Sequence, residues 1–425
     1  MDMHPERTLL IGLDTGEYDA QSSMDELEEL AQSAGGEVVA RMIQRRATPD
    51  GASYLGEGRL NEAEEFCDKN EVELIIADGE LTPTQQRNIE KKTGVRTIDR
   101  TMLILDIFAL NARTSEGKLQ VALAQLEYSL PRLTGKGSEL SRLGGGIGTR
   151  GPGESKLESD RRHIRRRIHA VKSQLEQVKK RRENIRQRRK KDRIETVAIV
   201  GYTNAGKSTL MNTLTSAGVL TQNKLFATLD PTSRFLRLPD GRDVMVTDTV
   251  GFIRRLPHHL VDAFRSTLEE VLYADVIVNV CDASSDEAEE HLKVTRQVLD
   301  ELGVGDTPVI SVYNKCDLLP ENTVWLGKRG DVKISALKGE GIDELLNAVA
   351  QALPKTRYRV KALIPFENGD ILGQLEHGGA VHSLEYVNEG TIVDVTAPVE
   401  YLESIKRFIL PPLSGEAEKT EINNG

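Results

Sequence analysis

Short apolar runs alternate with amphipathic stretches between residues 8 and 110. Runs at 9–13, 38–43, 74–77 and 95–98 predict strands, and stretches around 24–33, 60–69 and 84–92 predict helices. Strands separated by single helices favour a parallel sheet with right-handed crossovers. We therefore expect residues 1–112 to form a small N-terminal α/β domain. This segment contains no Gly-rich phosphate loop, so its sequence assigns it no chemistry.

A different periodicity follows. Apolar residues recur at alternating spacings of four and three in Leu119, Leu123, Leu126, Leu130 and Leu133. A second set continues this pattern in Leu157, Ile164, Ile168, Val171, Leu175, Val178 and Ile185, with Arg161 and Arg182 at two seam positions. Two successive heptad-patterned helices predict an antiparallel coiled-coil hairpin over residues 113–194. The second helix would be about 55 Å long and should extend beyond the first.

The loop that joins these helices, residues 135–153, is rich in glycine and arginine. It follows a helix and lacks a Gly-Lys-Ser/Thr ending, which argues against a second nucleotide loop. Arg142 and Arg150 favour a tip that contacts phosphate, and a flexible connector is the alternative.

From residue 195 the alternation of strand and helix resumes. Strands are predicted at 197–200, 235–238, 244–247, 276–280, 309–312 and 332–334, with helices beginning near 207, 262, 286 and 341. We expect a central domain over 195–356 and a small α+β C-terminal domain over 357–412 with a short helix near 399–408. The polar tail, 413–425, is expected to be disordered.

The strongest motif follows an apolar strand and opens a helix: Gly201-Tyr202-Thr203-Asn204-Ala205-Gly206-Lys207-Ser208. Its glycines let backbone N–H groups turn toward a phosphate at a helix N-terminus. Lys207 would reach the β and γ phosphates, and Ser208 would ligate Mg²⁺. This pattern indicates a nucleotide P-loop.

Three further motifs follow at strand ends: Asp248-Thr249-Val250-Gly251, Asn314-Lys315-Cys316-Asp317 and Ser335-Ala336-Leu337. Asp248 could hold a Mg²⁺-bound water, and the Gly251 backbone could approach the γ-phosphate. Asp317 offers a carboxylate to the paired N–H donors of guanine, which adenine lacks. The Ser335-Ala336 turn could present a backbone N–H to the guanine oxygen. Four elements in this order predict a GTP site in a P-loop GTPase domain with a parallel sheet.

Between the first two motifs lies a candidate switch loop, Leu225-Phe226-Ala227-Thr228-Leu229-Asp230-Pro231-Thr232. A switch threonine contacts Mg²⁺ and the γ-phosphate in the GTP state and releases after hydrolysis. Thr228 is the preferred candidate and Thr232 the alternative.

The resulting site has three overlapping sets. Hydrolysis is assigned to Lys207, Thr228, Asp248 and Gly251, and the metal to Ser208 and Thr228. Nucleotide binding is assigned to Gly201, Tyr202, Thr203, Asn204, Ala205, Gly206, Lys207, Ser208, Thr209, Phe226, Ala227, Thr228, Asp248, Thr249, Val250, Gly251, Asn314, Lys315, Cys316, Asp317, Ser335, Ala336 and Leu337.

Phe252 stands where Ras-like GTPases place the glutamine that orients the attacking water. A phenyl ring cannot do this, so we expect slow basal hydrolysis until a partner, another residue or a cation completes the site. Asn204 resembles the P-loop asparagine of potassium-activated GTPases, which makes K⁺ a candidate cofactor beside Mg²⁺. A tolerated turn residue is the alternative for Asn204.

Composition narrows the setting. The chain has 425 residues, 38% of them hydrophobic and 29% charged, which suits several domains. The widely spaced Cys67, Cys281 and Cys316 argue against a disulfide framework or zinc site and fit a reducing compartment. The N-terminus lacks an apolar signal core, and no apolar run is long enough to span a bilayer. We expect a cytoplasmic monomer.

Charge is distributed unevenly. The net charge is −10, yet residues 156–193 hold 17 Lys or Arg against 5 Asp or Glu, a local charge of +12. An acidic protein with one intensely basic segment favours a polyanionic partner bound at that place. The segment has no aromatic residue, so shape and charge, not base stacking, would bind RNA. A solvated coiled-coil face is the alternative.

The combined motifs, together with the upstream Gly-Gly-Ile-Gly-Thr-Arg-Gly-Pro-Gly-Glu and residues 113–120, resemble the HflX family of translational GTPases over roughly residues 8–355. The resemblance implies binding to the large ribosomal subunit, ribosome dissociation under stress, partial ribosome association and hydrolysis stimulated by ribosomes. It also implies that the hairpin tip reaches rRNA near the peptidyl transferase centre.

We expect GTP to order the Thr228 loop and residues 248–252, fixing the hairpin against the central domain so that it wedges into the ribosome. Two alternatives remain at this point. One is a GTPase that serves RNA modification or large-subunit assembly, and the other is a scaffold in which bound GTP is structural.

Overall fold

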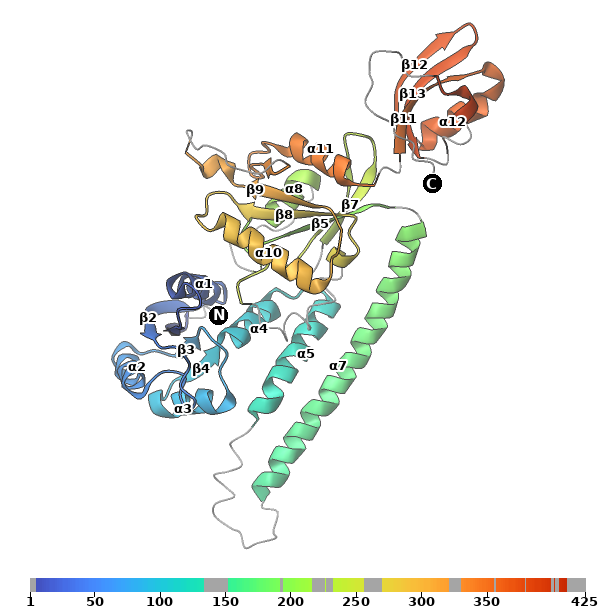
Figure 1. The fold of residues 1–425 in the computed structure, drawn as a ribbon. Coiled ribbons are helices and arrows are strands. Elements are labelled where there is room, and N and C mark those ends of the chain that lie inside the picture. Colours follow the sequence, from blue (N-terminus) through green and yellow to red (C-terminus); the bar gives the residue numbers. More distant parts are fainter. Residues whose placement is uncertain are drawn as a thin grey trace.

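A computed structural model describes residues 5–133, 152–191, 194–215, 226, 232–255, 270–320, 330–354, 357–378, 380–398, 401 and 405–410. Figure 1 shows four regions in chain order: the N-terminal domain, the helical hairpin, the central domain and the C-terminal domain. None of the helices within these ranges combines the length and the apolar character that crossing a bilayer requires.

The N-terminal domain has a parallel sheet of order β2-β1-β3-β4. Its strands are β1 (Arg7–Asp14), β2 (Glu37–Arg45), β3 (Leu74–Ala77) and β4 (Arg96–Asp99), and its crossover helices are α1 (Ala20–Ser33), α2 (Glu57–Asn70) and α3 (Pro83–Thr93). Local sequence explains the helix starts. Asp19 caps α1, and Thr82 with Gln85 forms a capping box at α3, followed by Pro83 at its first position. The predicted strands and helices of this region are confirmed.

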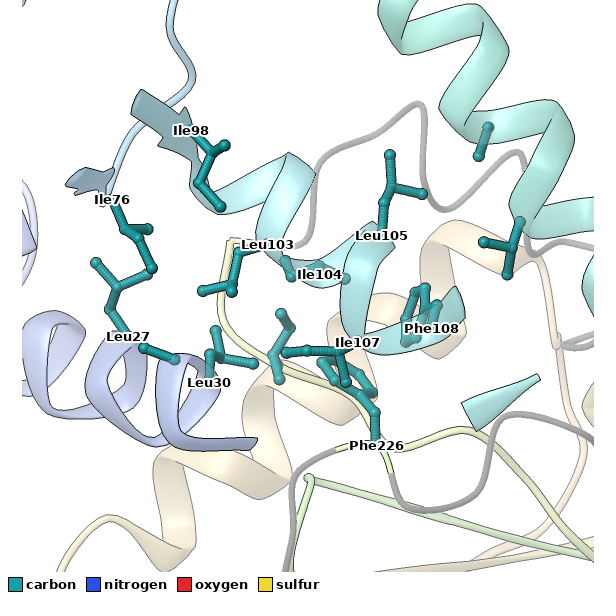
Figure 2. Packing of buried hydrophobic residues seen from close by; sticks show 14 of the residues in the cluster. Leu27, Leu30, Ile76, Ile98, Leu103, Ile104, Leu105, Ile107, Phe108 and Phe226 are labelled. Carbon is teal, nitrogen blue, oxygen red and sulfur yellow. The ribbon is translucent and has the colours of Figure 1, made fainter. Parts of the chain in front are cut away.

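One further helix, α4 (Arg100–Asn111), was not predicted. It is apolar on most of its surface, so it shows no amphipathic period. Figure 2 shows why: its side chains pack between Leu27, Leu30, Ile76 and Ile98 of the N-terminal domain and Phe226 of the central domain. Helix α4 therefore joins the two domains through a shared core.

The hairpin consists of α5 (Ser115–Arg132) and α7 (Pro152–Lys191). Lys172 pairs with Glu127 and Arg182 with Glu116, which fixes an antiparallel arrangement. The predicted seam is confirmed where side chains are described, because only these residues of 158–184 are half-buried while all others are exposed: Arg161, Ile164, Ile168, Val171, Leu175, Val178 and Arg182. Helix α7 is much the longer and extends toward the central domain (Figure 1). Residues 134–151, most of the predicted tip loop, lie outside the described ranges.

The central sheet has the order β10-β9-β8-β5-β7-β6. Its elements in chain order are β5 (Thr196–Gly201), α8 (Lys207–Thr215), β6 (Thr232–Arg237), β7 (Asp243–Asp248), β8 (Val276–Asp282), α10 (Ala288–Leu302), β9 (Val309–Asn314), the 3₁₀ turn η1 (Cys316–Leu318), β10 (Val332–Lys333) and α11 (Ile342–Ala352). Strand β6 runs antiparallel to β7, whereas the other pairs are parallel. The sheet is thus mixed at this edge, and β6 begins three residues before its predicted start. The helix predicted near 262 lies outside the described residues.

Arg242 is a buried junction of the central domain. Its side chain is 7% exposed, and its guanidinium bonds to Asp240 at 2.7 Å, to Glu195 at 3.2 Å and to the carbonyl of Pro354 at 3.2 Å. It also donates to the carbonyl of Ala350. One side chain therefore joins the start of β5, the turn before β7 and the end of α11.

Replacing Arg242 with Met should lower the free energy of unfolding by about 3–5 kcal/mol, because it leaves two carboxylates and two carbonyls without their buried donor. Urea unfolding of the nucleotide-free protein measures this. Arg237→Met, at an exposed arginine on the neighbouring strand, is the control and should change stability little. Equal effects of the two substitutions would contradict the junction role.

The C-terminal domain is a three-stranded antiparallel sheet of order β11-β13-β12, formed by β11 (Arg357–Ile364), β12 (Ala380–Val387) and β13 (Gly390–Pro398). Helix α12 (Gly369–Gly378) follows the 3₁₀ turn η2 (Phe366–Asn368) and packs on one face through Leu375. It was not predicted, because Gly369, Gly373 and Gly378 disguise it. The short helix predicted at 399–408 lies partly outside the described residues, which include the 3₁₀ turn η3 (Lys406–Phe408) there.

Candidate functional site

The loop between β5 and α8 adopts a shape that demands glycine at two positions. Gly201 has a φ of +147°, and a Cβ there would lie 2.0 Å from the carbonyl oxygen of Val280. Gly206 has a φ of +90°, and a Cβ would lie 2.2 Å from Nδ2 of Asn314. Neither φ suits a residue with a side chain. The loop can therefore press against neighbouring strands and turn its N–H groups inward.

Lys207 begins α8 and is buried. Its Nζ donates to the carbonyls of Gly201 at 3.1 Å and Tyr202 at 2.7 Å. Burial lowers the pKa of Lys207 to about 8, and the charge of Asp248 opposes this shift. The ammonium thus lies inside the loop, where a phosphate group would stabilise its charged form.

A hydroxyl and a carboxylate meet beside this lysine. Ser208 donates its hydroxyl to Oδ2 of Asp248 at 2.8 Å, and Asp248 ends strand β7 and is buried. A hydroxyl and a carboxylate are the hard donors that Mg²⁺ takes, usually one or two from protein with the rest from phosphates and waters. No group of three or more His, Cys, Asp or Glu suited to a metal occurs in the described part of the chain. The pair fits a metal delivered with a nucleotide.

The candidate guanine-binding residues are linked directly to the P-loop. Asn314 donates from Nδ2 to the carbonyl of Ala205 at 2.8 Å, and its Oδ1 accepts from the N–H of Ala336 at 2.9 Å. Asp317 accepts from the Ser335 hydroxyl at 2.6 Å, and this bond lowers the pKa of its carboxyl group. Asp317 is therefore an ionised acceptor held beside the loop of residues 335–337.

Other members of this set differ in accessibility. Lys315 has a φ of +62° and pairs with Asp282 at 2.7 Å, and Cys316 is half-buried. Leu337 is 79% exposed. Thr249 is buried, and its hydroxyl donates to the carbonyl of Ile199 in β5, so this side chain binds the sheet and not the nucleotide. The structure brings all four motifs together at the carboxyl ends of the central strands. They are the P-loop, Asp248-Thr249-Val250-Gly251, Asn314-Lys315-Cys316-Asp317 and Ser335-Ala336-Leu337.

The side chain of Phe252 does not point toward the nucleotide site. Its side chain is 2% exposed and packs in a cluster with Val200, Val271 and Ala274. Its backbone is bonded to the P-loop, since its N–H donates to Gly201 at 3.0 Å and its carbonyl accepts from Thr203 at 2.8 Å. The ring is therefore withdrawn from the position where a glutamine would orient water.

The candidate switch loop is described only at Phe226 and Thr232. Phe226 is buried, has a φ of +56° and packs edge-to-face on Phe108 of α4, with ring centroids 4.7 Å apart. Ala227 and Thr228 lie outside the described residues, and Thr232 is the first residue of β6. Asn204 is exposed with a φ of +61°, a backbone conformation that asparagine tolerates.

Sequence reasoning missed the contact between this site and the N-terminal domain. Tyr202 of the P-loop bonds Glu26 of α1 through its hydroxyl and stacks on His291 with ring centroids 3.8 Å apart. A large aromatic residue within a small, polar phosphate loop was the available signal.

Comparisons with known proteins agree with this geometry. Residues 21–109 match the family described as GTP-binding GTPase N-terminal, and residues 111–189 match the GTP-binding GTPase Middle Region. Residues 196–315 match the family described as 50S ribosome-binding GTPase.

Curated relatives match most of the chain. The GTPase HflX of Caldanaerobacter subterraneus is 50% identical over 405 residues, covering 95% of this chain and 94% of the relative. That of Escherichia coli is 42% identical over 343 residues, covering 78% and 79%. A crystal structure of SsGBP with GDP has a TM-score of 0.47 at 27% identity, covering 82% of this chain and 98% of that one. The chain belongs to the HflX family of GTPases, and it hydrolyses GTP to GDP and phosphate.

Proposed function

We propose that this GTPase binds the large ribosomal subunit and uses GTP binding and hydrolysis to split or rescue ribosomes under stress. The observation that carries the proposal is the charge on the outer face of α7. The exposed side chains there include Arg162, Arg165, Arg166, Arg167, Lys179, Lys180 and Arg181. Such a helix suits phosphate contacts, which supply affinity with little sequence reading. The match to a family described as 50S ribosome-binding GTPase supports the same partner.

The site supports a nucleotide switch. GTP would draw Thr228 and the Gly251 backbone toward its γ-phosphate, and loss of phosphate would release both segments. Lys207 would hold the phosphates, Ser208 and Thr228 would hold Mg²⁺, and Mg²⁺ would neutralise developing charge. Asp317, with Asn314 and the loop of 335–337, would select guanine.

Because Phe252 is withdrawn, hydrolysis is expected to need completion from outside. Ribosomal RNA or protein would supply the missing group or hold the switch loop in place, and K⁺ at Asn204 is a further candidate. Turnover would then be coupled to binding of the partner.

The test measures GTP turnover of the pure protein in K⁺ buffer with and without large ribosomal subunits. We expect stimulation on the order of tenfold or more, because a partner completes the site. Replacing K⁺ with Na⁺ in the same assay tests whether Asn204 helps to bind K⁺. If it does, GTP turnover should be slower in Na⁺ buffer.

Thr228→Ala serves as the matched variant in this assay. It should weaken GTP-dependent binding to the subunit more than GDP-dependent binding. A flat turnover rate at concentrations where subunits are bound would reject the proposal. It would favour a GTPase of RNA modification or subunit assembly, or a scaffold.

A further inference from the structure

The segment after Gly251 leaves the central domain and enters the N-terminal domain. Arg255 donates to Oδ2 of Asp78 at 2.8 Å and to the hydroxyl of Ser23 at 3.2 Å. Its guanidinium lies over the ring of Tyr18, 4.1 Å from the centroid. Its φ is +51°, a backbone conformation that is uncommon for a residue with a side chain.

Asp78 occupies a special place in its fold. It directly follows β3, is 1% exposed, and lies where the sheet order β2-β1-β3-β4 reverses direction between β1 and β3. Open parallel α/β sheets bind their ligands outside the carboxyl ends of strands at such a point. In this protein the Arg255 side chain occupies that ligand position. The other oxygen of Asp78 accepts from Arg100 at 3.0 Å, so the pocket is fixed from behind.

The neighbouring Arg254 is held as firmly. It donates to Ser22 of α1 at 2.6 Å and pairs with Glu287 at 3.0 Å. Its backbone N–H donates to the hydroxyl of Tyr202 at 2.9 Å, and its carbonyl accepts from Arg100 at 3.3 Å. The P-loop and the segment after Gly251 thus converge on the same face of α1.

The candidate switch loop is joined to the same domain. Asn111 at the end of α4 donates to the carbonyl of Phe226 at 2.9 Å, and Phe226 packs into the core drawn in Figure 2. Arg132 of α5 in turn bonds Asp99 at 3.2 Å and the carbonyl of Leu81 at 2.8 Å, which anchors the hairpin to the N-terminal sheet. A shift of the N-terminal domain would therefore also move helix α5 of the hairpin.

Gly251 lies close to the lysine and threonine of the P-loop. A Cβ on Gly251 would lie 3.0 Å from Nζ of Lys207 and 2.8 Å from Cγ2 of Thr203. A γ-phosphate that draws the Gly251 backbone toward itself would therefore shift this segment. Arg255 is four residues beyond Gly251, so such a shift would pull on the contacts of its guanidinium.

We propose that the pocket formed by Asp78, Ser23 and Tyr18 is a receptor for Arg255 that positions the segment after Gly251 and couples its engagement to nucleotide state. The engaged state favours GDP or no nucleotide, and the γ-phosphate weakens it. By thermodynamic linkage, docking of the pocket must then disfavour GTP relative to GDP by the same factor. The inference rests on the proposed nucleotide-driven reorientation of the hairpin, and it names the side chains that carry it.

The test compares equilibrium affinities of the full-length protein for a non-hydrolysable GTP analogue and for GDP. Arg255→Gln should raise the ratio of analogue to GDP affinity on the order of tenfold. Arg255→Lys keeps the charge and should lie between the two. Arg41→Gln is the matched control, because Arg41 pairs with Asp25 and Glu28 within the N-terminal domain, and it should leave the ratio unchanged. An unchanged or lowered ratio in Arg255→Gln overturns the proposal.

Amide hydrogen exchange of β3 and α4 separates this inference from the proposed function. In the wild-type protein, exchange should be faster with the GTP analogue than with GDP, and Arg255→Gln should remove the difference. If the wild-type protein and Arg255→Gln both exchange faster with the GTP analogue, the reorientation is supported but the pocket is not a receptor for Arg255. If the wild-type protein shows no difference, the reorientation falls as well. Ribosome-stimulated turnover is measured separately and depends on neither result.

Discussion

Replacement of Asp317 by Asn is expected to reduce the affinity for GTP by about 10⁴-fold and to transfer the preference to xanthosine triphosphate. The Asp317 carboxylate is ionised and oriented by the Ser335 hydroxyl at 2.6 Å, so both lone-pair directions toward the base act as acceptors. Guanine presents two N–H donors there. Asparagine would set an N–H group against one of them, leaving a buried mismatch, whereas xanthine offers a carbonyl to that N–H group.

Competition binding with GTP, ATP and xanthosine triphosphate measures this reversal. Asp306→Asn, at an exposed aspartate in the loop before β9, is the control and should keep the wild-type preference. The role of Asp317 is wrong if its variant still prefers GTP over xanthosine triphosphate as strongly as the wild-type protein.

The second large effect is expected at Ser208. Ser208→Ala should lower GTP turnover by about 10²- to 10³-fold, because it removes one of the two protein oxygens placed for Mg²⁺. The hydroxyl lies 2.8 Å from Asp248 Oδ2, so the alanine variant also removes this hydrogen bond from the carboxylate. Single-turnover hydrolysis over a range of Mg²⁺ concentrations is the measurement, and the Mg²⁺ requirement should move to higher concentration.

Ser208→Thr provides the control, since threonine restores the hydroxyl at the same position of a P-loop. Its turnover should stay close to that of the wild-type protein. Equal losses in the two variants would mean that packing at the start of α8, not metal binding, sets the rate.

Features that depend on local pattern could be predicted from the sequence. Glycine positions in the P-loop follow from phosphate geometry, and the observed φ angles of Gly201 and Gly206 require glycine there. The hairpin seam follows from heptad spacing, including arginines at 161 and 182 that spacing alone assigned. Strand ends placed Asp248 and Asn314 at one edge of the sheet, because parallel strands present their carboxyl ends together.

Features that depend on contacts between distant segments could not be predicted. Helix α4 is apolar on most sides because two domains cover it, and such a helix lacks the period that identifies amphipathic elements. Strand β6 reverses direction, which its sequence does not specify. Arg254 and Arg255 are ordinary charged residues in sequence. Only the approach of Ser22 to Arg254 and of Asp78 to Arg255, from 232 and 177 positions earlier, gives them a role. Thr228 stays a prediction.

The proposed action on ribosomes gives Arg242 a mechanical consequence. Glu195 lies just after α7, and Pro354 lies just before the C-terminal domain, so one guanidinium joins both flanks of the central domain. These contacts lie near the amino ends of β5 and β7, at the opposite edge of the sheet from the P-loop. A pull on the hairpin can therefore be passed to the C-terminal domain along the rear of the sheet. Such a load would follow a route separate from the proposed coupling of nucleotide state through Arg255.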